Sequence, residues 1–353
     1  MKTAITIFFF FGLYLEVASQ ESRVTLLFAG DAMQHLPQVQ GARNEDGSFA
    51  YDSCFSLMKE RISAADIAGL NFETTLGEVP YTGYPLFSSP DAFAFSLKDA
   101  GFDIFFQANN HALDRRRKGL ERTIDLLDSI GVKHTGTFRT EAERLLHYPL
   151  MVIKNGIRIA FLNYTYDTNG LPVKEPNKVN VIDTNRIIRD IRHTRLYKPD
   201  IIIAQMHWGE EYRTTPSFDQ QRLTNFLLSQ GVRIIIGHHP HVVQPIVVEK
   251  EKNEIQHVVY YSLGNFISNQ QRLHTGGGML AEIVISKKNI GSPVVIEKCG
   301  HTLVWVQKRM NNGKIQFSLV PSWEINKQPM GEEDKQKMNK FVEDVESILQ
   351  QEL

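Results

Sequence analysis

The chain contains 353 residues, with 39 Lys and Arg against 40 Asp and Glu, a formal net charge of −1 at pH 7 and 42% hydrophobic residues. These are ordinary values for a globular protein. The 2 cysteines are too few for a disulfide-rich scaffold. The balanced charge provides no basic field for nucleic acid, so we expect no nucleic-acid partner.

The N-terminal segment resembles a targeting signal. Lys2 precedes an apolar run, Ala4–Leu15, that is short for a membrane span and is ended by Glu16; the small residues 17–19 follow as a cleavage site. This pattern predicts a signal peptide over residues 1–19 and a periplasmic or extracellular mature protein. The alternative is a single N-terminal membrane anchor. In an oxidising compartment Cys54 and Cys299 either pair or are two buried apolar residues.

Apolar runs alternate with amphipathic segments along most of the chain. The runs are short and rich in Val, Ile, Leu and Phe, so each predicts a buried strand. They are Val24–Ala29, Asp66–Leu70, Phe102–Gln107, Ile157–Asn163, Ile201–Met206, Val232–Ile236 and Val258–Leu263. Helices are predicted from Ser89-Pro90 to Gly101, at Leu113–Ile130, and at Asp219–Gln230 after a Thr215-Pro216 cap. Strand and helix alternation favours a layered α/β fold.

The pattern changes near the C-terminus. Thr302–Met310 and Lys314–Val320 are strand-like and flank Asn311-Asn312-Gly313, which predicts a hairpin. Residues 326–353 are assigned to a C-terminal amphipathic helix, because the charged stretch after residue 332 has apolar residues at helical spacing. We therefore divide the chain into a signal peptide, one domain over 23–325 and this helix.

Polar residues follow almost every predicted strand. The segments are Gly30-Asp31, Asn71-Phe72-Glu73, Asn109-Asn110-His111, His207-Trp208-Gly209-Glu210, Gly237-His238-His239-Pro240-His241 and Gly264-Asn265-Phe266. Ligands bind outside the carboxyl ends of strands in open α/β sheets, so these groups are expected to converge. Carboxylates, amides and imidazoles without thiolates favour a divalent metal of intermediate hardness. We expect His239 and His241, two apart in extended backbone, to face the same way.

These motifs, in this order, resemble the CapA-type capsule synthesis proteins, also called poly-γ-glutamate synthesis proteins, of the calcineurin-like metallophosphoesterase superfamily. The resemblance covers roughly Val24–Ile267. Its most specific elements are His-Trp-Gly-x-Glu followed by Gly-x-His-Pro-His. It implies a two-sheet sandwich flanked by helices (α/β/β/α) and two divalent metal ions (Mn, Fe or Zn) at the strand ends.

The resemblance also implies roles for individual residues. Asp31 and His241 resemble ligands of the first metal, and Glu73 lies where the superfamily has a bridging aspartate. His111 resembles the catalytic histidine. The ligands of the second metal correspond to Asn110, His207 and His239. Residues expected to support the ligands or contact substrate are Asn71, Glu210, Tyr212, His238 and Asn265.

The chain departs from the superfamily pattern at three places, of which the first is Glu73 in place of the bridging aspartate. The opening Asp-x-His motif has Met33 in place of histidine, and His35 is the nearest substitute. The acidic residue that usually follows the catalytic histidine is replaced by Ala112, and Asp114 is the nearest group that can orient His111.

The sequence therefore favours a metal-dependent hydrolase acting on a phosphoester, with a role in capsule or poly-γ-glutamate synthesis. One alternative is a non-catalytic component that binds an anionic polymer within the capsule synthesis machinery at the membrane. Another is a hydrolase or transferase acting on the amide bonds of poly-γ-glutamate. The sequence contains no Gly-x-Ser-x-Gly motif, which argues against a serine hydrolase of that type. It also contains no Walker motif, which argues against a P-loop NTPase.

Overall fold

The computed structural model describes residues 21–289, 291–311 and 313–351. The predicted signal peptide at 1–19 lies outside the described residues. Within the described part of the chain, no helix has the length and apolar character needed to cross a membrane.

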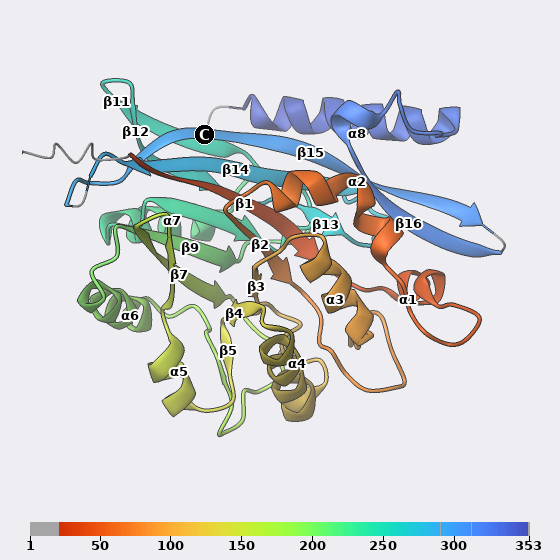
Figure 1. The fold of residues 1–353 in the computed structure, drawn as a ribbon, viewed down its shortest axis with the longest axis horizontal. Helices are drawn as coiled ribbons and strands as arrows, with labels where there is room; N and C mark the ends of the chain where they lie inside the picture. Colours follow the sequence, from red (N-terminus) through yellow and green to blue (C-terminus); the bar gives the residue numbers. More distant parts are fainter. Residues whose placement is uncertain (1–20, 290, 312, 352–353) are drawn as a thin grey trace, which may run out of the picture.

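Helices and strands alternate through the first two-thirds of the chain, and long strands dominate the rest (Figure 1). The helices are α1 (Leu36–Ala42), α2 (Asp52–Ser63), α3 (Asp91–Asp99), α4 (Arg116–Ile130), α5 (Glu141–His147), α6 (Thr184–Leu196), α7 (Phe218–Ser229), the 3₁₀ turn η1 (Ser322–Glu324) and α8 (Glu332–Leu349). The strands are β1 (Ser22–Ala32), β2 (Ile67–Phe72), β3 (Ile104–Phe106), β4 (Lys133–Thr135), β5 (Thr137–Phe138), β6 (Leu150–Lys154), β7 (Ile157–Thr165), β8 (Lys178–Val179), β9 (Ile201–His207), β10 (Ile234–His238), β11 (Ile246–Glu251), β12 (Glu254–Tyr260), β13 (Asn265–Ile267), β14 (Gly277–Lys287), β15 (Val295–Asn311) and β16 (Lys314–Pro321).

The main sheet is hydrogen-bonded in the order β4-β3-β2-β1-β14-β15-β12-β10-β9-β7-β6. β1, β2, β3 and β4 are parallel neighbours, as are β7, β9, β10 and β12. The two parallel groups are joined through antiparallel β14 and β15. The link between β15 and β12 is narrow, a single pairing of Ile255 with Ile296. The sheet folds over at this link, so the two groups form facing layers.

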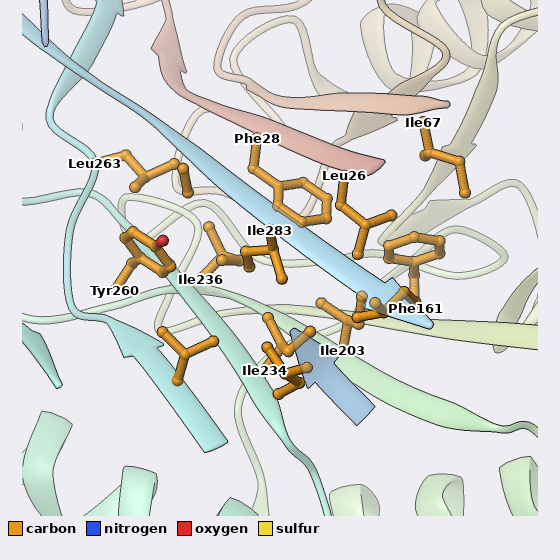
Figure 2. Close-up of a cluster of buried hydrophobic side chains, with 14 of the residues drawn as sticks. Leu26, Phe28, Ile67, Phe161, Ile203, Ile234, Ile236, Tyr260, Leu263 and Ile283 are labelled. Carbon is orange, nitrogen blue, oxygen red and sulfur yellow. The ribbon is translucent and has the colours of Figure 1, made fainter. Parts of the chain in front are cut away.

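Side-chain alternation along the strands builds the layers. In β1, Val24, Leu26 and Phe28 point into the core between the layers, which also contains Ile203 and Ile234 from the opposite layer (Figure 2). The intervening residues of β1 instead pack outward against α2 and α3. This period of two is the expected consequence of strand geometry.

Helices cover both outer faces of the folded sheet. α2 and α3 share a hydrophobic cluster with β1, β2, β3 and β16, while α6 and α7 share another with β7, β9 and β10. The order is therefore helix, sheet, sheet, helix. This arrangement confirms the predicted α/β/β/α sandwich.

Three predicted helix starts differ from the structure. α3 begins after Pro90, and the Ser89 hydroxyl lies 2.6 Å from that of Thr74 instead of capping the helix. α7 is capped by Ser217, which accepts a hydrogen bond from the backbone N–H of Gln220, and not by Thr215-Pro216. α4 begins at Arg116, because the preceding residues form a turn that holds the buried Asp114 side chain.

The C-terminal strands form the predicted hairpin, with Asn311 paired to Lys314. The last helix is shorter than the predicted 326–353: α8 spans Glu332–Leu349 and packs on β15 through Phe341 and Trp305, whose ring centroids lie 5.5 Å apart. Cys54 is a buried residue of α2, and Cys299 is partly buried on β15. Both are free thiols, so the structure contains no Cys54–Cys299 disulfide.

Candidate metal centre

The carboxyl ends of strands from both layers meet at one place. Asp31 of β1 is in register with Asn71 of β2, and His207 of β9 is in register with His238 of β10. Gly30 permits this approach, because a Cβ atom there would lie 2.0 Å from the carbonyl oxygen of Gly264. The predicted convergence of polar groups is therefore present in the fold.

The side-chain amide of Asn71 lies at the centre of this cluster. Its Nδ2 donates to Oδ1 of Asp31 at 2.8 Å and to Oε2 of Glu73 at 3.2 Å, and lies 3.2 Å from Nδ1 of His207. The other oxygen of Asp31, Oδ2, accepts from Nδ1 of His241 at 2.9 Å. All of these side chains are buried. Hydrogen bonds thus join groups that come from both layers of the sandwich.

The remaining oxygen of Glu73 has no hydrogen-bond partner although it is fully buried. Oε1 lies 3.6 Å from Nε2 of His207 and 3.9 Å from Nε2 of His241. These separations exceed a hydrogen bond, but two ligands held roughly 2.1 Å from one ion lie roughly 3–4 Å apart. The spacing around Glu73 therefore fits a metal ion better than direct contact.

Two sets of potential ligand atoms overlap, and Glu73 belongs to both. Within each set, all ligand atoms lie within 4.8 Å of one another. One set is Glu73, His239 and His241, and the other is Asp31, Glu73 and His207. The sharing of Glu73 matches a bridging position. The other members are grouped differently from the family-based expectation, which pairs His241 with Asp31 and His239 with His207.

Burial sets the protonation of the cluster. Desolvation, followed by the nearby Asp31 carboxylate, raises the pKa of Glu73 well above its ordinary value. Desolvation acts in the same direction on Asp31, but the hydrogen bond and charge of His241 outweigh it and lower the pKa of Asp31. Burial lowers the pKa of His239 to about 3 and that of His207 well below the ordinary value. Neutral imidazoles are the form that binds metals.

His239 and His241 do not lie in extended backbone as expected. Their φ angles are +96° and +58°, in the left-handed region that favours glycine. Both rings nevertheless reach Glu73, with centroids 5.8 Å apart. The convergence predicted for this pair therefore occurs through a tight turn after β10 and not through strand alternation.

Asn110 and His111 reach the cluster from the loop after β3. Oδ1 of Asn110 lies 2.8 Å from Nε2 of His207. Nδ1 of His111 donates to Oδ2 of Asp114 at 2.7 Å, and the same oxygen accepts from the backbone N–H of Phe87 at 2.6 Å. Burial raises the pKa of Asp114. Asp114 is thus placed to orient the ring of His111.

Other predicted residues lie at varying distances from the cluster. His238 contacts Gln205 at 2.9 Å, and its Nδ1 lies 3.8 Å from Oδ1 of Asp31. The Tyr212 ring lies 6.1 Å from that of His241. Glu210 does not support the ligands, because its side chain is exposed and lies 3.9 Å from Arg213.

The structure places His35 and Asn265 beside the cluster. His35 packs on Phe87, its Nδ1 lies 3.3 Å from the backbone nitrogen of Asn269, and it belongs to neither set of potential ligands. Asn265 pairs in register with Asp31, and its Nδ2 donates to Oε1 of Gln270. Nδ2 of Asn265 thus holds the following loop, while its Oδ1 is buried without a hydrogen-bond partner among the described residues.

The sequence analysis missed two contacts from the segment after β7. The ring of Tyr166 packs 4.4 Å from that of His239 and 6.3 Å from that of His207. Asn169 accepts a hydrogen bond from Asn110 at 3.1 Å. The signal for both residues is their position after the predicted strand Ile157–Asn163, because polar residues that follow parallel strands converge.

The fold and the cluster define a layered α/β protein with a buried group of carboxylates and imidazoles suited to metal ions. The chain belongs to the bacterial capsule synthesis protein PGA_cap family, whose model matches residues 25–270.

Two relatives of this chain have names that also refer to capsule or PGA biosynthesis. The chain is 30% identical over 281 residues to the PGA biosynthesis protein CapA of Bacillus subtilis, covering 75% of this chain and 68% of the relative. It is 26% identical over 278 residues to the capsule biosynthesis protein CapA of Bacillus anthracis, covering 74% of this chain and 64% of the relative.

Two solved structures are similar to the chain at low sequence identity. A "Putative 5'-Nucleotidase" from Staphylococcus aureus matches with a TM-score of 0.50 and 12% identity, over 91% of this chain and 58% of that one. The calcineurin-like phosphoesterase YfkN from Bacillus subtilis matches with a TM-score of 0.46 and 10% identity, over 93% of this chain and 98% of that one.

Proposed function

We propose that this chain is a metal-dependent phosphoester hydrolase that acts in capsule or poly-γ-glutamate synthesis outside the cytoplasm. The observation that carries the proposal is the Glu73 carboxylate, which is buried, shared by two sets of ligand atoms and left with one unpaired oxygen. Family membership and the names of the CapA relatives support the biological role. The pattern at 1–19 supports export through a signal peptide.

The residues of the cluster fit two divalent ions, for which the proposed ligands are Asp31, Glu73, Asn110, His207, His239 and His241. An unpaired carboxylate oxygen in a dry interior is costly unless a cation or donor meets it. The His239 Nδ1 atom is likewise buried without a partner. When bound, such a pair of ions supplies a nucleophilic water at neutral pH and charge for the attacking and leaving oxygens.

His111 is the proposed proton donor of the site. Because a carboxylate only accepts hydrogen bonds, the bond from Nδ1 to Asp114 fixes the hydrogen on that nitrogen. As a general acid, the imidazolium form of His111 donates the proton on Nε2 to the leaving oxygen and keeps the hydrogen on Nδ1. The backbone N–H of Phe87 holds Asp114 in place, so the ring orientation is set before substrate arrives.

Asn71 has a different proposed role, which is to hold the two carboxylates of the cluster in fixed positions. Its amide joins Asp31 to Glu73, whose like charges repel at close range. Tyr166, with 40% of its surface exposed, packs over His207 and His239 and shields the imidazoles from solvent.

The test is to measure metal content and hydrolysis on the same preparations. We expect about two ions per chain and cleavage of p-nitrophenyl phosphate or bis-p-nitrophenyl phosphate with Mn, Fe or Zn. His207→Ala and His239→Ala are expected to lose metal and activity, whereas His193→Ala, at a half-buried position in the last turn of α6, is the matched control. Full metal content in both ligand variants would refute the ligand assignment.

A second candidate is a non-catalytic component that binds capsule polymer. Met33, which is buried where the superfamily motif has a ligand histidine, favours this candidate because it removes one ligand from the first ion. A protein that holds both ions but cleaves neither phosphate substrate would support it. An assay for released glutamyl fragments distinguishes the third possibility, cleavage of the polymer's amide bonds.

A further inference from the structure

A cation lies beside the cluster without an acidic partner. The guanidinium carbon of Arg272 lies 4.3 Å from the centroid of the Tyr212 ring, and that ring lies 6.1 Å from the ring of His241. Arg272 follows β13 in the loop that leads to β14, and its side chain is exposed. The order from the interior outward is therefore imidazole, phenol ring and guanidinium.

The loop that carries Arg272 is fixed to β13, the strand that pairs with β1 beside Asp31. Asn265, in register with Asp31, donates from Nδ2 to Oε1 of Gln270 at 3.0 Å and to the carbonyl oxygen of Thr275 at 3.1 Å. The backbone N–H and hydroxyl of Thr275 then donate to the carbonyl oxygen of Arg272 at 3.2 and 2.7 Å. These bonds set the position of Arg272 relative to the cluster.

Among the residues that the structure describes, no carboxylate lies within 4.0 Å of the Arg272 guanidinium, which instead packs on the Tyr212 ring. Two other exposed arginines have acidic partners: Arg213 lies 3.9 Å from Glu210 and Arg222 lies 3.1 Å from Asp219. The nearest acid in sequence to the ring is Glu211. Burial, followed by the charge of Glu211, raises the pKa of Tyr212 to about 12, so the phenol stays neutral.

We propose that Arg272, held against Tyr212, binds a second anionic group of the substrate while the reacting group lies at the buried cluster. This inference rests on the proposed function and narrows it to substrates with at least two oxyanions, either carboxylates or phosphates. The planar guanidinium matches both through paired N–H donors. Stacking on the ring restricts the side chain without neutralising its charge.

The experiment measures binding, so it does not depend on hydrolysis. Calorimetric titrations compare the full-length wild type with Arg272→Ala, Arg272→Lys and the control Arg222→Ala, each with and without Mn. The ligands are a short γ-linked glutamate oligomer, a 5′-phosphorylated thymidine dinucleotide and inorganic phosphate. Arg272→Ala loses one charge-assisted contact, so its affinity for the extended ligand that the wild type prefers is expected to fall about tenfold.

The pattern across ligands identifies the source of the anion. Preference for the glutamate oligomer identifies carboxylates, and preference for the dinucleotide identifies phosphates. Inorganic phosphate, which has no second group, is expected to bind Arg272→Ala as it binds the wild type. Arg272→Lys is expected to lose less affinity than Arg272→Ala, because it keeps the charge but not the planar donors.

Two results would overturn the inference. One is wild-type affinity of Arg272→Ala for both extended ligands, and the other is binding of neither ligand by the wild type. Tyr212→Phe and Tyr212→Leu provide a second test, because the first keeps the ring and the second removes it. Equal affinity of these two variants would show that the stacked ring does not position Arg272. If the wild type shows no hydrolysis but Arg272→Ala still weakens binding of the oligomer, the proposed hydrolysis is wrong and the role of Arg272 stands.

Discussion

Replacing Glu73 with glutamine is expected to affect the metal-free and the metal-loaded protein in opposite directions. Glu73→Gln keeps the shape of the side chain but replaces a buried carboxyl group, whose Oε1 has no hydrogen-bond partner among the described residues, with an amide. A buried unsatisfied group costs about 1–3 kcal/mol. At roughly 2 °C per kcal/mol for a chain of this size, the metal-free variant should melt about 2–6 °C above the metal-free wild type.

The metal-loaded protein should respond in the reverse sense, because Glu73 belongs to both sets of ligand atoms. A hundredfold loss of affinity for an ion removes about 2.7 kcal/mol of ligand-linked stabilisation, or roughly 5 °C of the metal-induced shift. The assay is calorimetric melting in EDTA and in excess Mn, with metal content measured in parallel. Glu210→Gln is the matched control, because that side chain is exposed and should change little. A wild-type metal-induced shift in Glu73→Gln would refute the reasoning.

Three further predictions concern other residues. His111→Ala should lower turnover about 10²–10⁴-fold without loss of metal, and Asp114→Asn should lower it less; loss of metal in His111→Ala would contradict the assigned role. Burial opposes ionisation of Asp200, but the hydrogen bond from Lys287 at 2.7 Å and further contacts lower the pKa of Asp200. The stability that the ionised Asp200 contributes is therefore present at neutral pH and is lost as the pH falls below about 4. Asp200→Asn should therefore cost about 3 kcal/mol in urea unfolding at pH 7, and a cost that persists undiminished at pH 3 would argue against the pair. Phe341→Ala should cost about 3 kcal/mol by releasing α8 from β15, and an unchanged urea midpoint would show that the helix does not pack there.

Strand alternation and strand ends were predictable from the sequence because both are local. The run Val24–Ala29 has the composition of a buried strand, and β1 contains it. Polar residues after such runs were expected to meet, and Asp31, Asn71 and His207 are joined by hydrogen bonds. That expectation needed only the direction of each strand, not the order of strands in the sheet.

Features that depend on distant residues were not predictable in this way. The turn at His239 and His241 is held by contacts with Asp31, so its left-handed backbone cannot be read from the local sequence. Glu210 follows a strand end as closely as its neighbours do, but its side chain points to solvent. The stacking of Arg272 on Tyr212 joins residues sixty positions apart, and no periodic pattern marks such a pair.

The two facing layers give the cluster a property that its ligands alone do not have. Asp31 lies on one layer and His207 on the other, and the gap between the layers is filled by side chains such as Phe28 and Phe161, whose rings lie 6.2 Å apart. A smaller apolar residue at either position lets the layers move closer, and carboxylates and imidazoles then enclose less space. The space available to the proposed metal ions is therefore set in part by aromatic residues that lie in the core between the layers and outside the cluster.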